Sequence, residues 1–442
     1  MPLTFLGPYR DIFRYRSFRI FWLGFTFSVL GDAMTGVALT WLVYQSTHSA
    51  RAVGLLLLAS TGPVLVGGLL VGPLLDRFDR RAVMIADSIV RGLAVATIPL
   101  LHALGHLPLW PVYAVAAVYG CLKMITLAGT PALVPALVPA ARLDTANALE
   151  TLGYTVGGVI GPPMAGLLIA RIGAPNVVLV DALSYGAFAL ALTRVHLGVE
   201  RDAPSTTTAK VTAKVTATRA YRMGDAVALL RRNPVLLATT LMFMTFNIGE
   251  GALSVWLPLF SAQVARGGAA VYGALLGVLA VGETAGSLLA GGLMAPRRLS
   301  MGALICLAQG LSGLALLPLL FGRDLPWAVV SLALLGACSA PLTIWAQTLR
   351  MRIIPPELRG RAFALLRTLM QGTMPLAGVA AGLLLPIVGI PAMIGLSALL
   401  IGLPGPLGYQ VKDLRRLPAG VGGAMERDAT GTPVGPVPAG DR

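Results

Sequence analysis

Apolar blocks of about 20 to 25 residues divide the chain, and this division constrains its fold more than any other feature. A helix of that length, at about 1.5 Å per residue, crosses the roughly 30 Å hydrocarbon core of a bilayer. Composition agrees, since 56% of the residues are hydrophobic and only 12% are charged. Soluble domains carry about 25% charged residues. The sequence therefore predicts an all-α integral membrane protein.

Twelve such blocks are present, and their number determines where the two ends of the chain lie. Their approximate centres are Asp32, Pro63, Gly92, Gly120, Val159, Gly186, Phe246, Leu279, Ser312, Leu335, Pro375 and Ala398. Glycine and proline are frequent inside the blocks, as is usual for membrane helices, whose neighbours satisfy the freed backbone groups. An even number of crossings predicts that both termini lie on the same side of the membrane.

Lysine and arginine are distributed unevenly between the two sides. With the N-terminus in the cytoplasm, 27 of the 34 basic residues fall on the cytoplasmic side and three fall within the blocks, namely Arg91, Lys123 and Arg367. Only four fall on the outer side, namely Arg51, Arg171, Arg266 and Arg323. The positive-inside rule thus predicts a multi-pass protein of the plasma or inner membrane with cytoplasmic termini. This topology also explains the net charge of +15, because no soluble domain remains that would bind nucleic acid.

No cofactor or metal site is expected, and neither is an enzyme. Cys121, Cys306 and Cys338 lie in apolar blocks without CxxC spacing, and the four histidines lack ligand spacing. A membrane enzyme would need a nucleophile with a base, or metal ligands, and no such cluster is visible along the chain.

A polar, threonine-rich stretch containing STTTAKVTAKVTATRAYRMGD separates two halves of the chain. We expect a six-helix bundle over 1–197, a cytoplasmic central loop over 198–232, a second six-helix bundle over 233–408 and a disordered cytoplasmic tail over 409–442. The halves resemble each other at a nearly constant offset. The matching pairs are Gly31-Asp32 with Gly249-Glu250, Gly54 with Gly273, and Gly72 with Gly291. Such a repeat predicts two pseudo-symmetric bundles with a substrate site near the midplane between them.

The loop after the second block reads GPLLDRFDRR and carries five charges in six positions. It resembles the best-known motif of the major facilitator superfamily in both residues and place. The matching residues are Gly72, Asp76, Arg77, Arg80 and Arg81. Asp79 stands where the superfamily usually has a second glycine. The repeated copy, GGLMAPRR, has Ala295 at the acidic position, so only the first copy can act through a carboxylate.

The resemblance implies a conformational latch at this loop. Gly72 would let helices approach closely, and Asp76 would accept hydrogen bonds from the positive N-terminus of the eleventh helix, which begins near PPELRGRAF. The alternative is that the arginines only set the topology, although the positive-inside rule requires no aspartate.

Further segments extend the resemblance over almost the whole chain, namely GDAMTGVALTWLVYQSTHSA, DRFDRRAVMIADSIVRG, LVPAARLDTANAL and IIPPELRGRAFALLRT. Together they are similar to the drug:proton antiporter branch that includes macrolide efflux proteins and the enterobactin exporter. The resemblance implies a monomeric exporter, in contact with lipid, that exchanges protons for a small amphipathic drug-like molecule or siderophore. An importer or facilitator on the same fold, or a receptor or scaffold without transport, remains the alternative.

The fifth block contains GGVIGPPMAG, which resembles the glycine-proline motif of antiporters in the same superfamily. Its residues are Gly157, Gly161, Pro162 and Gly166. Ordinary close packing through small residues explains this spacing equally well.

Ionisable residues near the middle of the blocks are the candidates for substrate and proton binding, because each costs at least about 2.5 kcal/mol in the bilayer centre unless it has a partner or water. They are Asp32, Lys123, Glu250 and Glu283. We expect Asp32 and Glu250 to face one central cavity. Asp87 and Arg91 are four residues apart and should form a structural pair. Asp181 lies nearer the outer surface and is expected to cap or pair locally.

Overall fold

The computed structural model describes residues 7–196, 223–292, 299–322 and 324–415, and within these ranges all regular structure is helical. The first half contains α1 (Gly7–Ile12), α2 (Arg16–Thr47), α3 (Ala50–Arg77), α4 (Arg80–Ala103), α5 (Leu109–Leu133), α6 (Leu143–Ile172) and α7 (Ala174–Arg194). The second half contains α9 (Met223–Arg232), α10 (Pro234–Gln263), α11 (Gly268–Gly292), α12 (Met301–Leu314), α13 (Pro318–Phe321), α14 (Leu325–Ile353), α15 (Arg359–Gln371), α16 (Thr373–Gly402), α17 (Pro404–Tyr409) and α18 (Lys412–Arg415).

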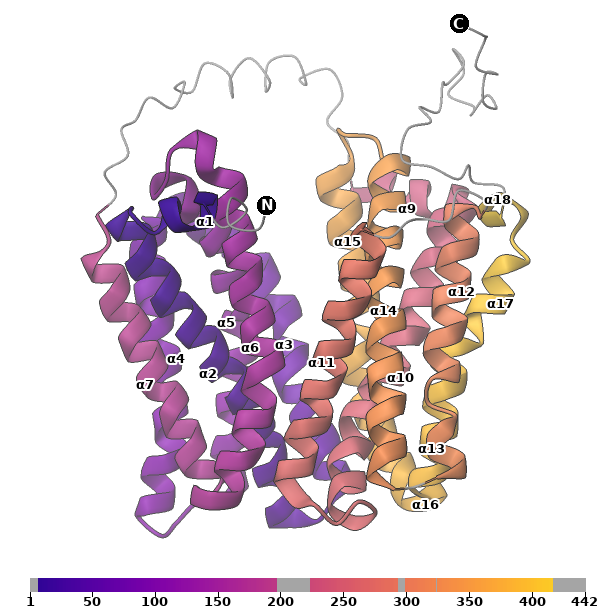
Figure 1. Cartoon of the computed structure of the whole chain (residues 1–442), viewed down its shortest axis with the longest axis horizontal. Coiled ribbons are helices and arrows are strands. Elements are labelled where there is room, and N and C mark those ends of the chain that lie inside the picture. The colour runs from indigo at the N-terminus through magenta and orange to yellow at the C-terminus, as the bar shows by residue number, and fades with distance from the viewer. Residues whose placement is uncertain (1–6, 197–222, 293–298, 323, 416–442) are drawn as a thin grey trace, which may run out of the picture.

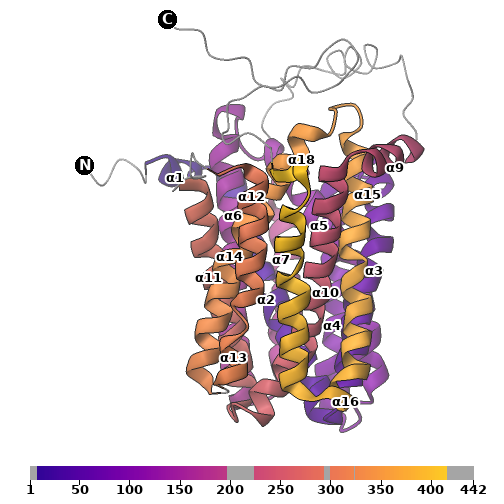
Figure 2. The ribbon, with the colours of Figure 1, turned by 90° about the vertical axis from the view of Figure 1, so that its right-hand side faces the viewer.

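Eleven segments of the described chain are long and apolar enough to cross a membrane, and the last of them is double. It runs for 51 residues over Arg359–Tyr409 and is broken at Gly389, whose φ of 80° lies in the left-handed region that favours glycine. The chain reverses there, so that α15 and the first part of α16 run toward one face and the rest of α16 and α17 return toward the other (Figures 1 and 2). The two arms account for the eleventh and twelfth crossings expected from the sequence.

Large apolar side chains cover the outer surface of the structure. Leu93, Leu183, Leu288, Leu376 and Ile387 are between 64% and 77% exposed. Such a surface is unfavourable in water but matches the hydrocarbon of a bilayer. The exposed leucines therefore agree with the fold class predicted from composition.

The repeat-related glycines occupy equivalent places in the two bundles. A Cβ atom on Gly54 of α3 would lie 2.3 Å from the carbonyl oxygen of Gly378 on α16. A Cβ atom on Gly273 of α11 would lie 2.2 Å from the carbonyl oxygen of Pro162 on α6. Two matching interfaces, α3 with α16 and α11 with α6, therefore join the bundles. The pseudo-symmetric architecture predicted from the offset is confirmed.

The described ends of the chain lie on one face, which we call the terminus face. Figures 1 and 2 show α1, α9 and α18 together there. Residue ranges 1–6, 197–222 and 416–442 lie outside the described residues, as do most of the central loop and tail expected from the sequence. The described part of that central loop contains α9, and the described part of the tail contains α18.

Close contacts between the bundles concentrate toward the opposite face. Gly54 and Ala50, near the start of α3, contact α16, and Gly166 contacts the start of α11 at Ala269. The rings of Trp41 and Tyr272 stack across the same end, with centroids 6.4 Å apart. At the terminus face, by contrast, the helices of the two bundles lie apart (Figure 1), and a Cβ atom on Gly72 would meet nothing within 4 Å. The bundles are thus closed at the opposite face and separate at the terminus face.

Candidate functional site

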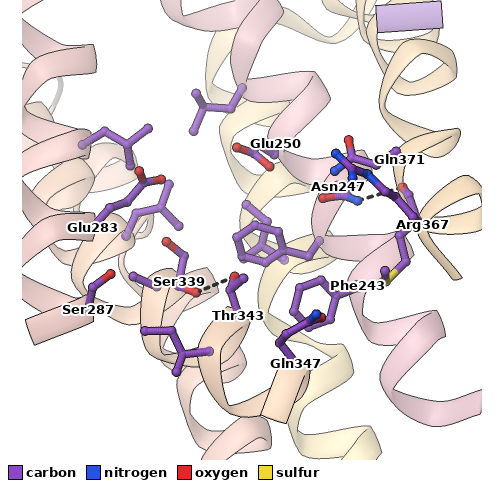
Figure 3. A pocket seen from close by; sticks show the side chains of 18 of the residues that line it. Phe243, Asn247, Glu250, Glu283, Ser287, Ser339, Thr343, Gln347, Arg367 and Gln371 are labelled. Carbon is purple, nitrogen blue, oxygen red and sulfur yellow. Dashed lines mark hydrogen bonds between the residues drawn. The ribbon is translucent and has the colours of Figure 1, made fainter. Parts of the chain in front are cut away.

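A cavity of about 690 Å³ lies within the C-terminal bundle, between α10, α11, α14, α15 and α16. Figure 3 labels nine of its polar lining residues, namely Asn247, Glu250, Glu283, Ser287, Ser339, Thr343, Gln347, Arg367 and Gln371. Arg350 also lines the cavity. Phenylalanine, leucine and isoleucine side chains make up most of the remaining wall. The volume falls in the range of small-molecule sites, and the mixed lining suits an amphipathic molecule.

The cavity brings together two of the predicted acids, Glu250 on α10 and Glu283 on α11 (Figure 3). Within the described residues neither carboxylate has an ion-pair partner. Glu250 is partly buried and Glu283 is exposed to the space that it lines. The acids are electrostatic neighbours, so a cation or a proton that enters the cavity would relieve the repulsion between them.

Arg350 gives the cavity a positive group that the sequence did not indicate. In the sequence Arg350 follows the tenth apolar block and is one of the 27 basic residues assigned to cytoplasmic segments; its placement in a loop is wrong, because α14 continues to Ile353 and Arg350 is buried in the protein. Arg350 is only 2% exposed and lies over the Phe243 ring, 4.4 Å from its centroid. It donates a 3.0 Å hydrogen bond to the backbone oxygen of Thr239, and no carboxylate pairs with it among the described residues.

Asp87 and Arg91 on α4 form the predicted pair, which belongs to a larger buried network in the N-terminal bundle. Arg91 donates to Asp87 through Nε at 3.0 Å and also through Nη2. Its remaining donors reach the Thr126 hydroxyl on α5 and, at 3.0 Å, the Tyr185 hydroxyl on α7. Arg91 is 1% exposed. It therefore links α4 to α5 and α7 as well as pairing within its own helix.

Asp32 on α2 joins this network at its more accessible edge. Its Oδ2 lies 3.7 Å from Arg91 Nη1, and the Tyr185 hydroxyl donates to its Oδ1. The Asp32 side chain is 18% exposed, and Lys123, an exposed residue of α5, is within electrostatic reach. Neither Asp32 nor Lys123 lines the cavity that contains Glu250. The four predicted midplane residues are thus divided between two polar regions, one in each bundle.

The charged loop between α3 and α4 is fixed by its arginines and by Asp79. Asp79 caps α4 by accepting a 2.9 Å hydrogen bond from the Ala82 backbone. Arg80 donates to the Ala132 carbonyl at 3.0 Å, near the C-terminal end of α5. Arg81 donates to the Leu192 carbonyl at 2.7 Å, in the last turn of α7. These are favourable positions for cations, because helix C-termini carry partial negative charge.

Asp76 remains unengaged in this conformation. It is exposed at the end of α3, as is Arg77, and within the described residues its carboxylate has neither an ion pair nor a hydrogen bond. The expected partner of Asp76, the N-terminus of α15, has Leu358 as its N-cap and no side-chain cap, while the Arg359 side chain donates to the Met351 and Ile354 carbonyls at the end of α14. The latch that the resemblance implies is therefore open here.

The glycine-proline segment of α6 packs on both of its sides. A Cβ atom on Gly157 would lie 2.6 Å from Val29, and one on Gly161 would lie 2.7 Å from Ala33, both on α2. Gly166 faces α11, where a Cβ atom would lie 2.5 Å from the Ala269 carbonyl. Pro162 contributes the carbonyl that Gly273 meets. Small-residue packing is thus observed, and the role of this segment in antiport stays a prediction.

Among the described residues, no group of three or more His, Cys, Asp or Glu side chains has the arrangement of a metal site.

Similarity to known proteins assigns the chain to a family. The sequence profile of the transmembrane secretion effector family matches residues 8–419. The chain belongs to this family. Its relatives include the multidrug efflux pump Tap of Mycolicibacterium fortuitum, 28% identical, covering 84% of this chain and 90% of the pump. Macrolide efflux protein A of Streptococcus pyogenes is 24% identical, with coverages of 91% and 97%. The resemblance to efflux transporters of the major facilitator superfamily is confirmed.

Solved structures share the fold of this transmembrane secretion effector family member at low identity. A POT family transporter in complex with a thioalcohol-conjugated peptide has a TM-score of 0.67 at 12% identity, covering 91% of this chain and 97% of that one. A bacterial homologue of the iron transporter ferroportin, in an inward-facing state, has a TM-score of 0.66 at 16% identity, with coverages of 89% and 98%. The family and these neighbours are transporters, and the chain is a multi-pass membrane protein of this kind.

Proposed function

We propose that this protein is a secondary active transporter that exports a small amphipathic molecule in exchange for protons. The observation that carries the proposal is the cavity of about 690 Å³ with apolar walls and two carboxylates that lack ion-pair partners. The efflux pumps among the relatives support export over import. We further propose a monomer in the cell membrane with cytoplasmic termini, as the basic-residue bias predicts.

The chemistry of the cavity supports coupling by competition. An ionised carboxylate away from water is costly, so Glu250 and Glu283 favour either a proton or a cationic group. A carboxylate that binds a proton can no longer pair with the cationic group of a substrate, so binding of the one displaces the other. The substrate class that fits is an amphipathic molecule with a basic nitrogen near the acids and a hydrogen-bond acceptor toward Arg350.

The packing of the bundles supports alternating access. The bundles are closed at the opposite face and apart at the terminus face. With cytoplasmic termini this is the inward-facing conformation, in which an exporter takes up its substrate. The orientation is tested by labelling a single cysteine at Ser205 with an impermeant reagent, because labelling from outside intact cells would contradict it.

The deciding experiment reconstitutes the purified protein in proteoliposomes and measures the uptake of a panel of lipophilic cations, macrolides and siderophores. We expect accumulation of at least one compound against its gradient when the compartment that receives it is acidic, and loss of this accumulation on adding a proton ionophore. Equilibration that never exceeds the outside concentration would indicate a facilitator. Gradient-driven movement in the opposite direction would indicate an importer, and binding without movement would indicate a receptor.

A further inference from the structure

Asp181 on α7 is a buried carboxyl that the proposed transport cycle has not used. Asp181 is fully buried, with 0% of its surface exposed. The Ser184 hydroxyl donates a 3.0 Å hydrogen bond to Oδ1, whereas Oδ2 has no hydrogen-bond partner in the described structure. Among the described residues no cation lies within ion-pair distance of either oxygen.

Neither of the two nearby cations, Arg91 and Lys123, forms an ion pair with Asp181. Arg91 holds Asp87 through two donors and lies 3.7 Å from Asp32. Lys123 is exposed on α5 at the edge of the network. The buried network thus contains three carboxyls for one guanidinium, and Asp181 is the one without a cation. Because an isolated buried carboxylate costs far more than a neutral acid, a buried group in this position takes up a proton.

The surroundings of Asp181 suit a carboxyl that gains and loses this proton. A Cβ atom on Gly31 would lie 2.3 Å from Asp181 Oδ1, so the glycine is what allows the carboxyl to reach α2 directly beside Asp32. The Thr35 hydroxyl, also on α2, faces Asp181 and has no hydrogen-bond partner of its own in the described structure. A proton on Oδ2 would give that hydroxyl a donor, and after the proton leaves, the Thr35 and Ser184 hydroxyls can donate to the carboxylate.

The titratable groups within electrostatic reach of Asp181 lie on four helices. They are Asp32 on α2, Arg91 on α4, Tyr119 on α5 and Tyr185 on its own helix. Of these, Asp32 is the only carboxyl, and its side chain is 18% exposed. Asp32 is therefore the group through which a proton on Asp181 can reach water.

We propose that Asp181 is a proton-binding site of the N-terminal bundle that is loaded and emptied through Asp32. In the conformation seen here Asp181 is the acid and Asp32 the carboxylate. The proton passes from Asp181 Oδ2 to Asp32, leaving Asp181 ionised, and then from Asp32 to water, which leaves both groups ionised until the next proton enters. This inference rests on the proposed proton antiport and gives the proton a location separate from the cavity of the C-terminal bundle.

The test is Asp181→Asn, which preserves the shape of the side chain and an acceptor for Ser184 but cannot release a proton. Purified wild type and variant are compared in proteoliposomes for substrate accumulation driven by a pH gradient and for substrate exchange without a gradient. For one-to-one exchange, one pH unit drives accumulation of up to about tenfold in the wild type. We expect accumulation near onefold in Asp181→Asn with exchange retained. Asp413→Asn, an exposed aspartate of α18, is the matched control.

A second measurement on the wild type keeps the proposal testable if the variant is poorly folded. Near neutral pH the wild-type infrared spectrum should contain a C=O band of a protonated carboxyl that is missing from Asp181→Asn and is lost as the pH rises, whereas any such bands from Glu250 and Glu283 should appear in both proteins. Normal accumulation with unchanged pH dependence in the variant, or no such band in the wild type, would overturn the proposal. If the wild type transports without any gradient dependence, proton antiport fails, and the pH dependence of this band alone decides whether Asp181 binds a proton.

Discussion

Asp32 and Glu250 occupy equivalent positions in the two repeats but have different surroundings. Asp32 has Arg91 at 3.7 Å and a donor hydroxyl from Tyr185, whereas Glu250 lines the cavity without a cation partner in the described residues. A neutral amide cannot release a proton. We therefore expect Asp32→Asn and Glu250→Gln each to abolish gradient-driven accumulation while sparing downhill exchange of substrate.

Counterflow and gradient-driven uptake, measured on the same proteoliposomes, separate these two activities. Glu283→Gln is the comparison, since Glu283 lines the same cavity but has no acidic counterpart predicted from the repeat. Accumulation with normal pH dependence in both single variants and in the double variant would exclude the pair and leave Glu283 as the cavity's coupling group.

Arg350 offers a second prediction about a single side chain. A hydrogen bond to a charged group contributes about 1.5 to 3 kcal/mol, which corresponds to roughly 10- to 150-fold in affinity. We expect Arg350→Met to weaken binding of a substrate that carries an acceptor by about this factor, with little change in thermal stability, because losing the Thr239 hydrogen bond is offset by removing a buried charge that has no acidic partner in the described residues. Binding is measured by calorimetry, with the exposed Arg361→Met of α15 as control. Unchanged affinity would remove Arg350 from the binding site.

At the scale of helices, different residues of the loop between α3 and α4 would serve membrane topology and gating. Arg80 and Arg81 bind the C-terminal ends of α5 and α7 in the present conformation, while Asp76 is exposed and unengaged. If Asp76 contacts the N-terminus of α15 only when the terminus face closes, Asp76→Asn should slow transport strongly with normal expression. Transport rates per unit of inserted protein test this expectation. Normal transport in Asp76→Asn, together with altered insertion in Arg80→Ala and Arg81→Ala, would leave the motif a topological role alone.

The sequence predicted the helices far better than their polar contacts. Hydropathy depends on local composition, so the sequence alone predicts the twelve crossings and the repeat. The reversal at Gly389 falls between Pro375 and Ala398, the expected centres of the last two crossings. The Asp87–Arg91 pair was readable because both residues lie on one helix face. The reach of Arg91 to α5 and α7 was not, since it depends on which helices pack together.

Arg350 and Asp181 show the same limit in the placement of site residues. A basic residue at the end of an apolar block resembles a loop residue, and only the extension of α14 to Ile353 reveals that Arg350 is enclosed. Local pairing of Asp181 was expected and is observed with Ser184, but its burial against Gly31 depends on the packing of α7 on α2. Two features of the sequence agree with this burial. Gly31, next to Asp32, leaves room for the Asp181 carboxyl, and Ser184, three residues after Asp181, supplies its hydrogen-bond donor.

At the scale of the whole molecule, transport requires the bundles to separate at the face where they now touch. Gly273 of α11 is the tightest repeat-related contact, because its Cβ position lies 2.2 Å from the Pro162 carbonyl. Gly273→Val would force α11 away from α6, and overpacking of this kind costs about 1 to 3 kcal/mol. That cost falls on the closed interface only, so we expect a shift of roughly 5- to 150-fold toward the conformation open at the opposite face.

Spin labels on the two bundles near the opposite face would report this shift as a longer distance distribution. The matched control is Gly186→Val on α7, where a Cβ atom would meet nothing within 4 Å, so the same side chain is added without loading an interface. A shift seen only in Gly273→Val would show that the close glycine contact between α11 and α6 determines the balance between the two conformations. Its repeat-related counterpart is the contact between α3 and α16. The same distances in Gly273→Val and Gly186→Val would instead mean that α11 and α6 move together, and that the bundles open along a different interface.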